Sequence, residues 1–141
     1  MTLYVIDTDL LSLYQRNHPQ LSNRIRIARA NGIIIKTTAI TVEEQCTGRL
    51  AQIRKAKTPE VLVAAYDKLI TTVSFFSELE ILPYGLVADN YFRQFRQMGI
   101  RIGTQDLRIA SITLAHDGIV ITRNRKDFEQ VPGLKNEDWS L

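Results

Sequence analysis

The sequence is poor in the side chains that most often do chemistry in proteins. It contains one cysteine, Cys46, and two histidines, His18 and His116, among 141 residues. A single thiol excludes an intrachain disulfide and any zinc site built from several thiolates. Two histidines leave almost no material for a histidine-rich zinc centre or a Ser-His-Asp relay. We therefore expect any catalytic chemistry to come from carboxylates.

Long hydrophobic runs are also missing. No stretch of about eighteen apolar residues occurs, which excludes a conventional transmembrane helix. The first acid, Asp7, comes too early for the apolar segment of a signal peptide, so we expect a cytoplasmic protein that does not bind membranes. The 45% hydrophobic content suffices for one core, and the length predicts a single domain over residues 1–141.

Neither sign of charge dominates. The chain carries 18 Lys and Arg against 15 Asp and Glu, a formal net charge of +3. This is only a weak preference for anionic partners and does not by itself predict nucleic-acid binding.

Short apolar runs alternate with amphipathic helical patterns along the chain, and this order predicts a parallel sheet covered by helices. We expect strands at residues 3–6, 33–38, 79–82 and 119–122, with a short fifth strand beginning at Val131. We expect the first helix to be capped by Thr8 or Asp9. Thr41-x-x-Glu44 fits a capping box for the third helix. The apolar stripe of the helix that begins at Pro59 is expected to face the core, although two such helix faces could also form an interface.

Carboxylates fall where a parallel sheet places its ligands, beyond the carboxyl ends of the strands. Asp7 ends the first strand, and Asn124 and Asp127 follow the fourth. Glu44 and Asp106 lie near the starts of helices that follow such loops, where the helix dipole would help keep them ionised. If the first and fourth strands are neighbours, these oxygens converge, and a bound cation would relieve their repulsion.

The candidate ligands are hard oxygens, which favour Mg²⁺ or Mn²⁺ over zinc. One or two such ions would activate water for phosphodiester cleavage. Structural roles compete with this interpretation. Asp106 could favour a helix N-terminus, Glu44 could complete the capping box, and Asp127 could be a surface acid. Asp7 is the hardest to explain structurally, because a carboxylate directly after an apolar strand seldom serves packing.

Four motifs occur in order along essentially the whole chain: VIDTD at residues 5–9, ITVEE at 40–44 with Gly48, IGTQDLRIA at 102–110, and VITRNRKDF at 120–128. Together they resemble the PIN-domain family, and more narrowly the VapC-type ribonuclease toxins of type II toxin–antitoxin systems. The resemblance implies a PIN-like three-layer α/β/α sandwich with a central, mainly parallel sheet of four to five strands.

The resemblance also implies roles for individual residues. Asp7, Glu44 and Asp106 would hold Mg²⁺ or Mn²⁺, with Glu44 preferred over Glu43 because the family's acid lies four residues before the glycine, here Gly48. Asp127 would be a fourth catalytic residue, with Asn124 as the alternative at that place. The side chains supporting the ligands would be Thr8, Thr122 and Asn124, and those contacting RNA phosphates would be Arg123, Arg125 and Lys126.

The implied function is endonucleolytic cleavage of structured RNA, such as tRNA or rRNA, by a homodimeric toxin with a cognate antitoxin. Two alternatives stay open. A haloacid-dehalogenase-like phosphatase would use Asp7 as its nucleophile, although no convincing lysine and late acidic pair accompany it. A catalytically silent PIN-fold module would bind RNA or protein, although all three core acids are present.

Overall fold

The structure, a computed structural model, describes residues 2–141. Its centre is a five-stranded sheet in the order β3-β2-β1-β4-β5. Each neighbouring pair of strands is parallel. The strands are β1 (Leu3–Ile6), β2 (Ile34–Thr38), β3 (Ile81–Leu82), β4 (Ile119–Ile121) and β5 (Lys135–Glu137).

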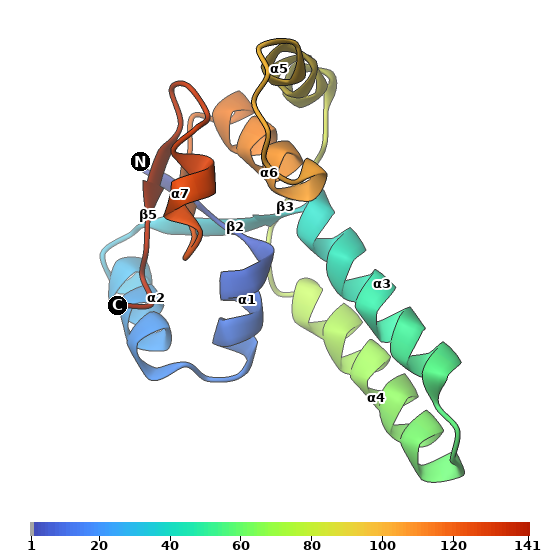
Figure 1. Cartoon of the computed structure of the whole chain (residues 1–141). Coiled ribbons are helices and arrows are strands. Elements are labelled where there is room, and N and C mark those ends of the chain that lie inside the picture. The colour runs from blue at the N-terminus through green and yellow to red at the C-terminus, as the bar shows by residue number, and fades with distance from the viewer. Residues whose placement is uncertain (1) are drawn as a thin grey trace.

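Helices cover both faces of this sheet. In Figure 1, α5 and α6 lie on one face, α1 and α2 on the other, and α3 and α4 project from the body as a helical pair that we call the arm. This arrangement confirms the predicted α/β sandwich. The helices are α1 (Thr8–Gln15), α2 (Pro19–Ala30), α3 (Ala39–Lys55), α4 (Pro59–Phe76), α5 (Leu86–Gln97), α6 (Thr104–Ala115) and α7 (Arg125–Phe128).

The alternation of side chains along the strands divides the core in two. Val5 and Val120 face the helices α5 and α6, whereas Ile6 and Ile121 face α1 and α2. Each of these four side chains is at most 1% exposed. A strand buried on both faces is typical of a parallel sheet, and it explains the unbroken apolar runs in the sequence.

The strand order reverses between β1 and β4. The chain builds β2 and β3 on one side of β1, then crosses to place β4 on the other side. The register pairs Ile6 with Ile121, and the Asp7 amide donates to the Ile121 carbonyl at 3.1 Å. The first and fourth strands are therefore neighbours, as the convergence argument requires, and their carboxyl ends form the crevice expected at such a reversal.

Two helices begin differently from the sequence prediction. Asp7 itself caps α1, because its side chain accepts from the Leu10 amide. Thr38 caps α3 by accepting from the Thr41 amide, so α3 starts earlier than predicted and the proposed Thr41–Glu44 capping box is wrong. Both are short oxygen side chains that suit a cap, and the sequence offers several such residues in a row.

The apolar stripe of α4 faces the core only at the end of the helix. Phe76 is buried and packs in the core as expected, whereas Tyr66 is 52% and Val73 56% exposed. The arm projects away from the sheet (Figure 1), so its helices pack mainly on each other. Hydrophobic periodicity identified the helix correctly but not the surface against which it packs.

The chain after β4 also departs from expectation. Residues 125–128 form the short helix α7, and the fifth strand is residues 135–137 rather than a strand beginning at Val131. Val131 is buried in the connection, while the β5 residues are polar and only partly buried. Trp139 packs against Tyr4 with ring centroids 4.8 Å apart, so the tail docks on the body as expected. Within residues 2–141, no helix is both long and apolar enough to cross a membrane.

Candidate active site

Asp7 lies at the strand reversal and is 3% exposed. Its Oδ1 accepts from the Leu10 amide at 2.9 Å, and the Thr122 hydroxyl bonds to the same carboxyl group. The pKa of Asp7 is raised to about 7, mainly by burial and to a smaller degree by the charges of Asp9 and Asp106, while the two hydrogen bonds partly oppose the shift. The backbone thus fixes a carboxylate where its charge is poorly solvated.

Asp106 reaches the same crevice from the first turn of α6. Burial raises its pKa, and the charge of Glu44 is the next largest cause, followed by those of Asp127 and Asp9; a hydrogen bond from Asn124 opposes them. The predicted stabilisation of ionised Asp106 by the helix dipole is therefore outweighed by burial and by neighbouring acids. Because such repulsion acts only over short distances, the Asp106 and Glu44 carboxylates lie near each other.

Glu44 is oriented by a hydroxyl. Thr8 donates to Glu44 Oε1 at 2.6 Å, and the Thr8 and Thr41 hydroxyl oxygens lie 2.9 Å apart. Glu44 lies beyond the first turn of α3, so its side chain does not cap the helix. The neighbouring Glu43 is exposed and accepts from Gln105 at 2.9 Å. The two adjacent glutamates therefore have different environments.

Asn124 links the remaining acid to the site. Its Nδ2 donates to Asp127 Oδ2 at 2.8 Å, and its side chain also bonds to Asp106. Its backbone amide donates to Thr122 Oγ1 at 2.9 Å. The turn that starts α7 thus places Asn124 between two carboxylates, and which of Asn124 and Asp127 completes the site stays open. We call Asp7, Glu44, Asp106 and Asp127 the acidic site.

The basic residues after β4 are engaged with neighbours. Arg123 forms two charge-assisted hydrogen bonds with Asp9, at 2.7 and 2.8 Å, and this pairing raises the pKa of Arg123. Arg125 donates to Asn136 Oδ1 at 2.7 Å, and Lys126 is exposed. The Arg123–Asp9 pair is about half exposed, so its contribution to stability is modest. That Arg123, Arg125 and Lys126 contact RNA phosphates stays a prediction.

Sequence reasoning missed one buried polar contact beside the site. Gln45 is 5% exposed and exchanges two hydrogen bonds with Gln15, at 2.9 and 2.8 Å. Gln45 also donates to Ser12 Oγ at 3.3 Å. These bonds hold α3 against α1 directly after Glu44. No periodicity or motif marks such a pair, because the partners are thirty residues apart in the sequence.

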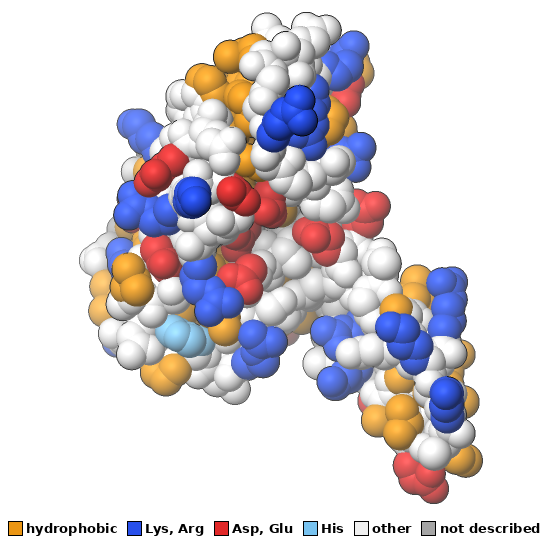
Figure 2. Space-filling view, in the orientation of Figure 1, with side chains coloured by type: hydrophobic (Ala, Val, Ile, Leu, Met, Phe, Trp, Pro, Cys, Tyr) orange, Lys and Arg blue, Asp and Glu red, His pale blue; other side chains and the backbone are white. Residues whose placement is uncertain are grey.

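Hydroxyl and amide groups lie between the carboxylates of the acidic site. Over residues 2–141, no three His, Cys, Asp or Glu side chains stand at the spacing needed to bind one metal ion together. Asp and Glu side chains nevertheless gather in the middle of the face shown in Figure 2, with Lys and Arg around them. The donor set consists of carboxylate, hydroxyl and amide oxygens, which suits Mg²⁺ or Mn²⁺. For three of the carboxylates to bind one ion together, their side chains would have to move closer to one another.

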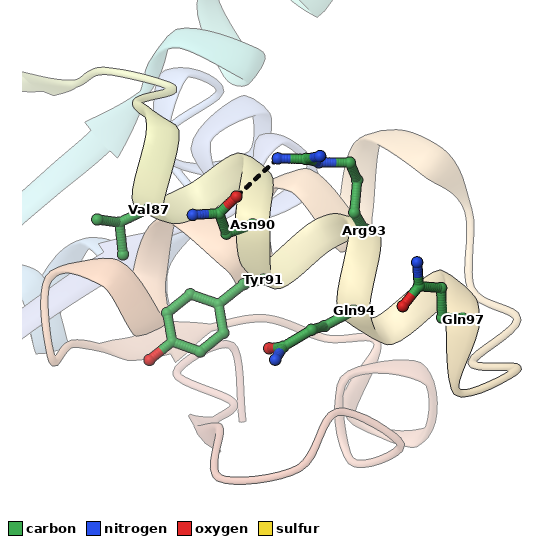
Figure 3. A pocket seen from close by; sticks show the side chains of 6 residues that line it. All are labelled: Val87, Asn90, Tyr91, Arg93, Gln94 and Gln97. Atoms are coloured by element: carbon green, nitrogen blue, oxygen red, sulfur yellow. Dashed lines mark hydrogen bonds between the residues drawn. The ribbon is translucent and has the colours of Figure 1, made fainter.

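A surface hollow of about 500 Å³ lies elsewhere, on α5. Figure 3 shows its lining side chains projecting from this one helix, with Asn90 bonded to Arg93 at 2.6 Å. No residue of the acidic site lines it, so it does not extend the crevice. The lining residues are Val87, Asn90, Tyr91, Arg93, Gln94 and Gln97.

No protein-family model matches the chain. A curated protein of Rickettsia felis, "Ribonuclease VapC2", is 28% identical over 142 residues, covering 97% of this chain and 98% of that protein. A "tRNA(fMet)-specific endonuclease VapC" of Salmonella typhimurium is 27% identical over 144 residues, covering 99% of each.

Solved structures agree with the sequence relatives. VapBC2 from Rickettsia felis, bound to a promoter DNA fragment, matches with a TM-score of 0.74 and 26% identity over 98% of this chain and 99% of that one. DNA-bound VapBC from Salmonella typhimurium matches with a TM-score of 0.76 and 26% identity over 99% of each chain. The chain is thus similar in sequence and in fold, over nearly its whole length, to VapC ribonucleases. The resemblance drawn from its four motifs is therefore confirmed, and the VapC fold extends over nearly the whole chain.

Proposed function

We propose that this chain is a metal-dependent endoribonuclease and the toxin of a type II toxin–antitoxin pair. The observation that carries the proposal is the acidic site at the β1–β4 reversal, in a chain similar over nearly its full length to proteins named as ribonucleases and tRNA endonucleases. The substrate class is structured RNA. The cognate antitoxin and a homodimer complete the proposed assembly.

Asp7, Glu44 and Asp106 would hold one or two Mg²⁺ or Mn²⁺ ions. The support is electrostatic: burial and mutual repulsion raise the pKa of Asp7 and Asp106, and a cation removes that penalty. When bound, a divalent ion lowers the pKa of its water and neutralises charge on the phosphodiester.

The chain's own groups position the reacting atoms. The Leu10 amide and the Thr122 hydroxyl fix Asp7, and Thr8 fixes Glu44. Asn124 orients both Asp106, which is partly buried, and Asp127. Asp127 can then accept a proton from the attacking water. Arg123, Arg125 and Lys126 are the expected phosphate contacts, with Arg123 first releasing Asp9.

The alternatives gain no support. A phosphatase using Asp7 as nucleophile would need a positioned lysine and a late acidic pair close in sequence, and the sequence offers no convincing set. A silent binding module would not need three acids that repel one another in one crevice.

RNA cleavage by the purified protein tests the proposal. Small RNA would be incubated with Mg²⁺, Mn²⁺ or EDTA, using wild type, Asp106→Asn and the exposed control Asp117→Asn. We expect discrete fragments with wild type and Asp117→Asn in the presence of metal, and none with Asp106→Asn or EDTA. Equal products from all three proteins, or metal-independent cleavage, would refute the proposal.

Glu44→Gln is expected to reduce the cleavage rate by on the order of 10²-fold or more, because it removes a charge from the acidic site. Glu43→Gln is the matched control, since it changes the adjacent glutamate that faces solvent and Gln105. We expect its rate to stay within about twofold of wild type. The measurement is the initial cleavage rate of each variant on the same RNA. A larger loss of rate for Glu43→Gln than for Glu44→Gln would show that Glu43, not Glu44, belongs to the acidic site.

Thr8→Val is expected to reduce cleavage by about 10- to 100-fold, because the hydroxyl that orients Glu44 is lost while the side-chain volume is kept. Thr8→Ser restores the hydroxyl and should recover most of the rate. The metal concentration for half-maximal rate should rise in Thr8→Val only. A purely structural role would instead lower the melting temperature and leave that concentration unchanged.

A further inference from the structure

A groove of about 780 Å³ separates the end of α1 and the start of α2 from the arm. Its lining includes the basic side chains Arg16, Arg49 and Lys68 and contains no Asp or Glu. Figure 2 shows a notch between the arm and the rest of the molecule, with Lys and Arg side chains on both sides and Asp and Glu side chains above it. A groove with cations on both walls suits an anionic ligand.

The groove lies next to the acidic site, beyond the Gln15–Gln45 contact that joins α1 to α3. α1 and α3 run side by side from the carboxyl edge of the sheet, and contacts follow one another along them. Nearest the sheet, the hydroxyl groups of Thr8 and Thr41 are in contact, and further along the helices Gln15 and Gln45 are hydrogen-bonded to each other. Beyond this pair, α1 and α3 both line the groove. Arg49 is one of the lining residues and follows Glu44 by about 7.5 Å along the axis of α3.

The basic side chains of the groove are not neutralised by acids. Within the described part of the chain, neither Arg16, Arg49 nor Lys68 forms an ion pair. Arg49 Nη1 donates to Gln52 at 2.9 Å, but its Nε is buried without a hydrogen-bond partner. Unsatisfied buried donors are rare in folded proteins, and this one is explained by an acceptor that a ligand brings.

We propose that this groove binds the phosphodiester backbone of the single-stranded RNA segment next to the scissile phosphate. The inference rests on the proposed nuclease function and names the path that the substrate takes from the acidic site. Two aromatic side chains, Tyr14 and Phe75, also line the groove. A basic track with aromatic side chains beside it is how proteins bind single strands without reading their sequence. An apolar protein helix fits less well, because it would leave the three cations unpaired.

The double variant Arg16→Ala/Lys68→Ala tests the groove, since both side chains are exposed and their removal leaves the core intact. The matched control is Arg26→Ala/Lys57→Ala, which removes the same charge from exposed positions outside the groove. For cleavage of a twelve-nucleotide RNA, we expect the groove variant to raise KM by about tenfold with kcat within about twofold, because these contacts act equally in ground and transition states. A four-nucleotide RNA centred on the cleavage site should show no difference.

Binding supplies a second readout. In an Asp7→Asn background, the groove substitutions should reduce the salt slope for twelve-nucleotide RNA by about 1.4, the value for two lost phosphate contacts on a single strand. If the groove and control variants behave alike while wild type cleaves RNA, the groove proposal is wrong and the nuclease proposal stands. Weakened binding of a polyglutamate peptide with unchanged RNA binding would assign the groove to an acidic peptide instead. Failure of wild type to bind or cleave RNA would overturn both proposals.

Discussion

Asp7→Asn is expected to lower the rate of RNA cleavage by on the order of 10³-fold and, at pH 8, to stabilise the fold. Asn keeps the oxygen that accepts from the Leu10 amide, so α1 retains its cap. It removes the negative charge that burial disfavours at this position. An activity loss combined with a stability gain is typical of a functional residue held in an unfavourable environment.

The measurement pairs initial cleavage rates with melting temperatures at pH 8 in EDTA. Asp117→Asn serves as the control, because it makes the same chemical change at an exposed residue at the end of α6. We expect its rate and melting temperature to match wild type. If Asp7→Asn loses activity and stability together, the side chain is primarily structural and its proposed role as a ligand is wrong.

The free energy of unfolding is expected to fall by about 3 kcal/mol between pH 5 and pH 8 through Asp7 alone. In the unfolded chain this carboxyl loses its proton near its ordinary pKa of 3.8, whereas in the folded protein it keeps the proton to about pH 7. Between these values the folded state binds more protons, so stability decreases as pH rises. The raised pKa of Asp106 acts in the same direction.

Urea denaturation at several pH values in EDTA measures this effect. The difference between wild type and Asp7→Asn isolates the contribution of Asp7 from other titrating groups. The two curves should agree near pH 4 and separate as pH rises to 8, with wild type the less stable. Parallel curves across this range would show that Asp7 is ionised in the folded protein at acidic pH, which the burial of its carboxyl group does not allow.

The sheet could be predicted from the sequence because parallel strands are buried on both faces. Val5 and Ile6 in β1, and Val120 and Ile121 in β4, form unbroken apolar runs between helical patterns. The residue that ends the first run, Asp7, was identifiable for the same reason. β5 gave no such signal, because its three residues are polar and belong to an edge strand that is only partly buried.

The packing of helices was less predictable than their existence. α4 has the periodicity of a core helix, yet it lies in the arm, and of its apolar stripe only Phe76, at the end of the helix, is fully buried in the core. Helix propensity and charge are the same for Glu43 and Glu44, so neither property tells which of the two belongs to the site. Only the spacing to Gly48 in the family distinguished them, and the structure separates them by the hydrogen bond from Thr8. The Arg123–Asp9 pair joins residues 114 positions apart, and no local pattern predicts such a contact.

The central claim is that the acidic site binds a divalent cation, and calorimetric titration with Mn²⁺ at pH 6.5 tests it most directly. Wild type and Asp117→Asn should bind Mn²⁺ with the same affinity. Asp7→Asn and Asp106→Asn should each weaken binding by at least tenfold, and proton release should accompany binding to wild type, because the cation displaces the proton that Asp7 retains. Equal Mn²⁺ binding by all four proteins, or no binding by wild type, would contradict the account.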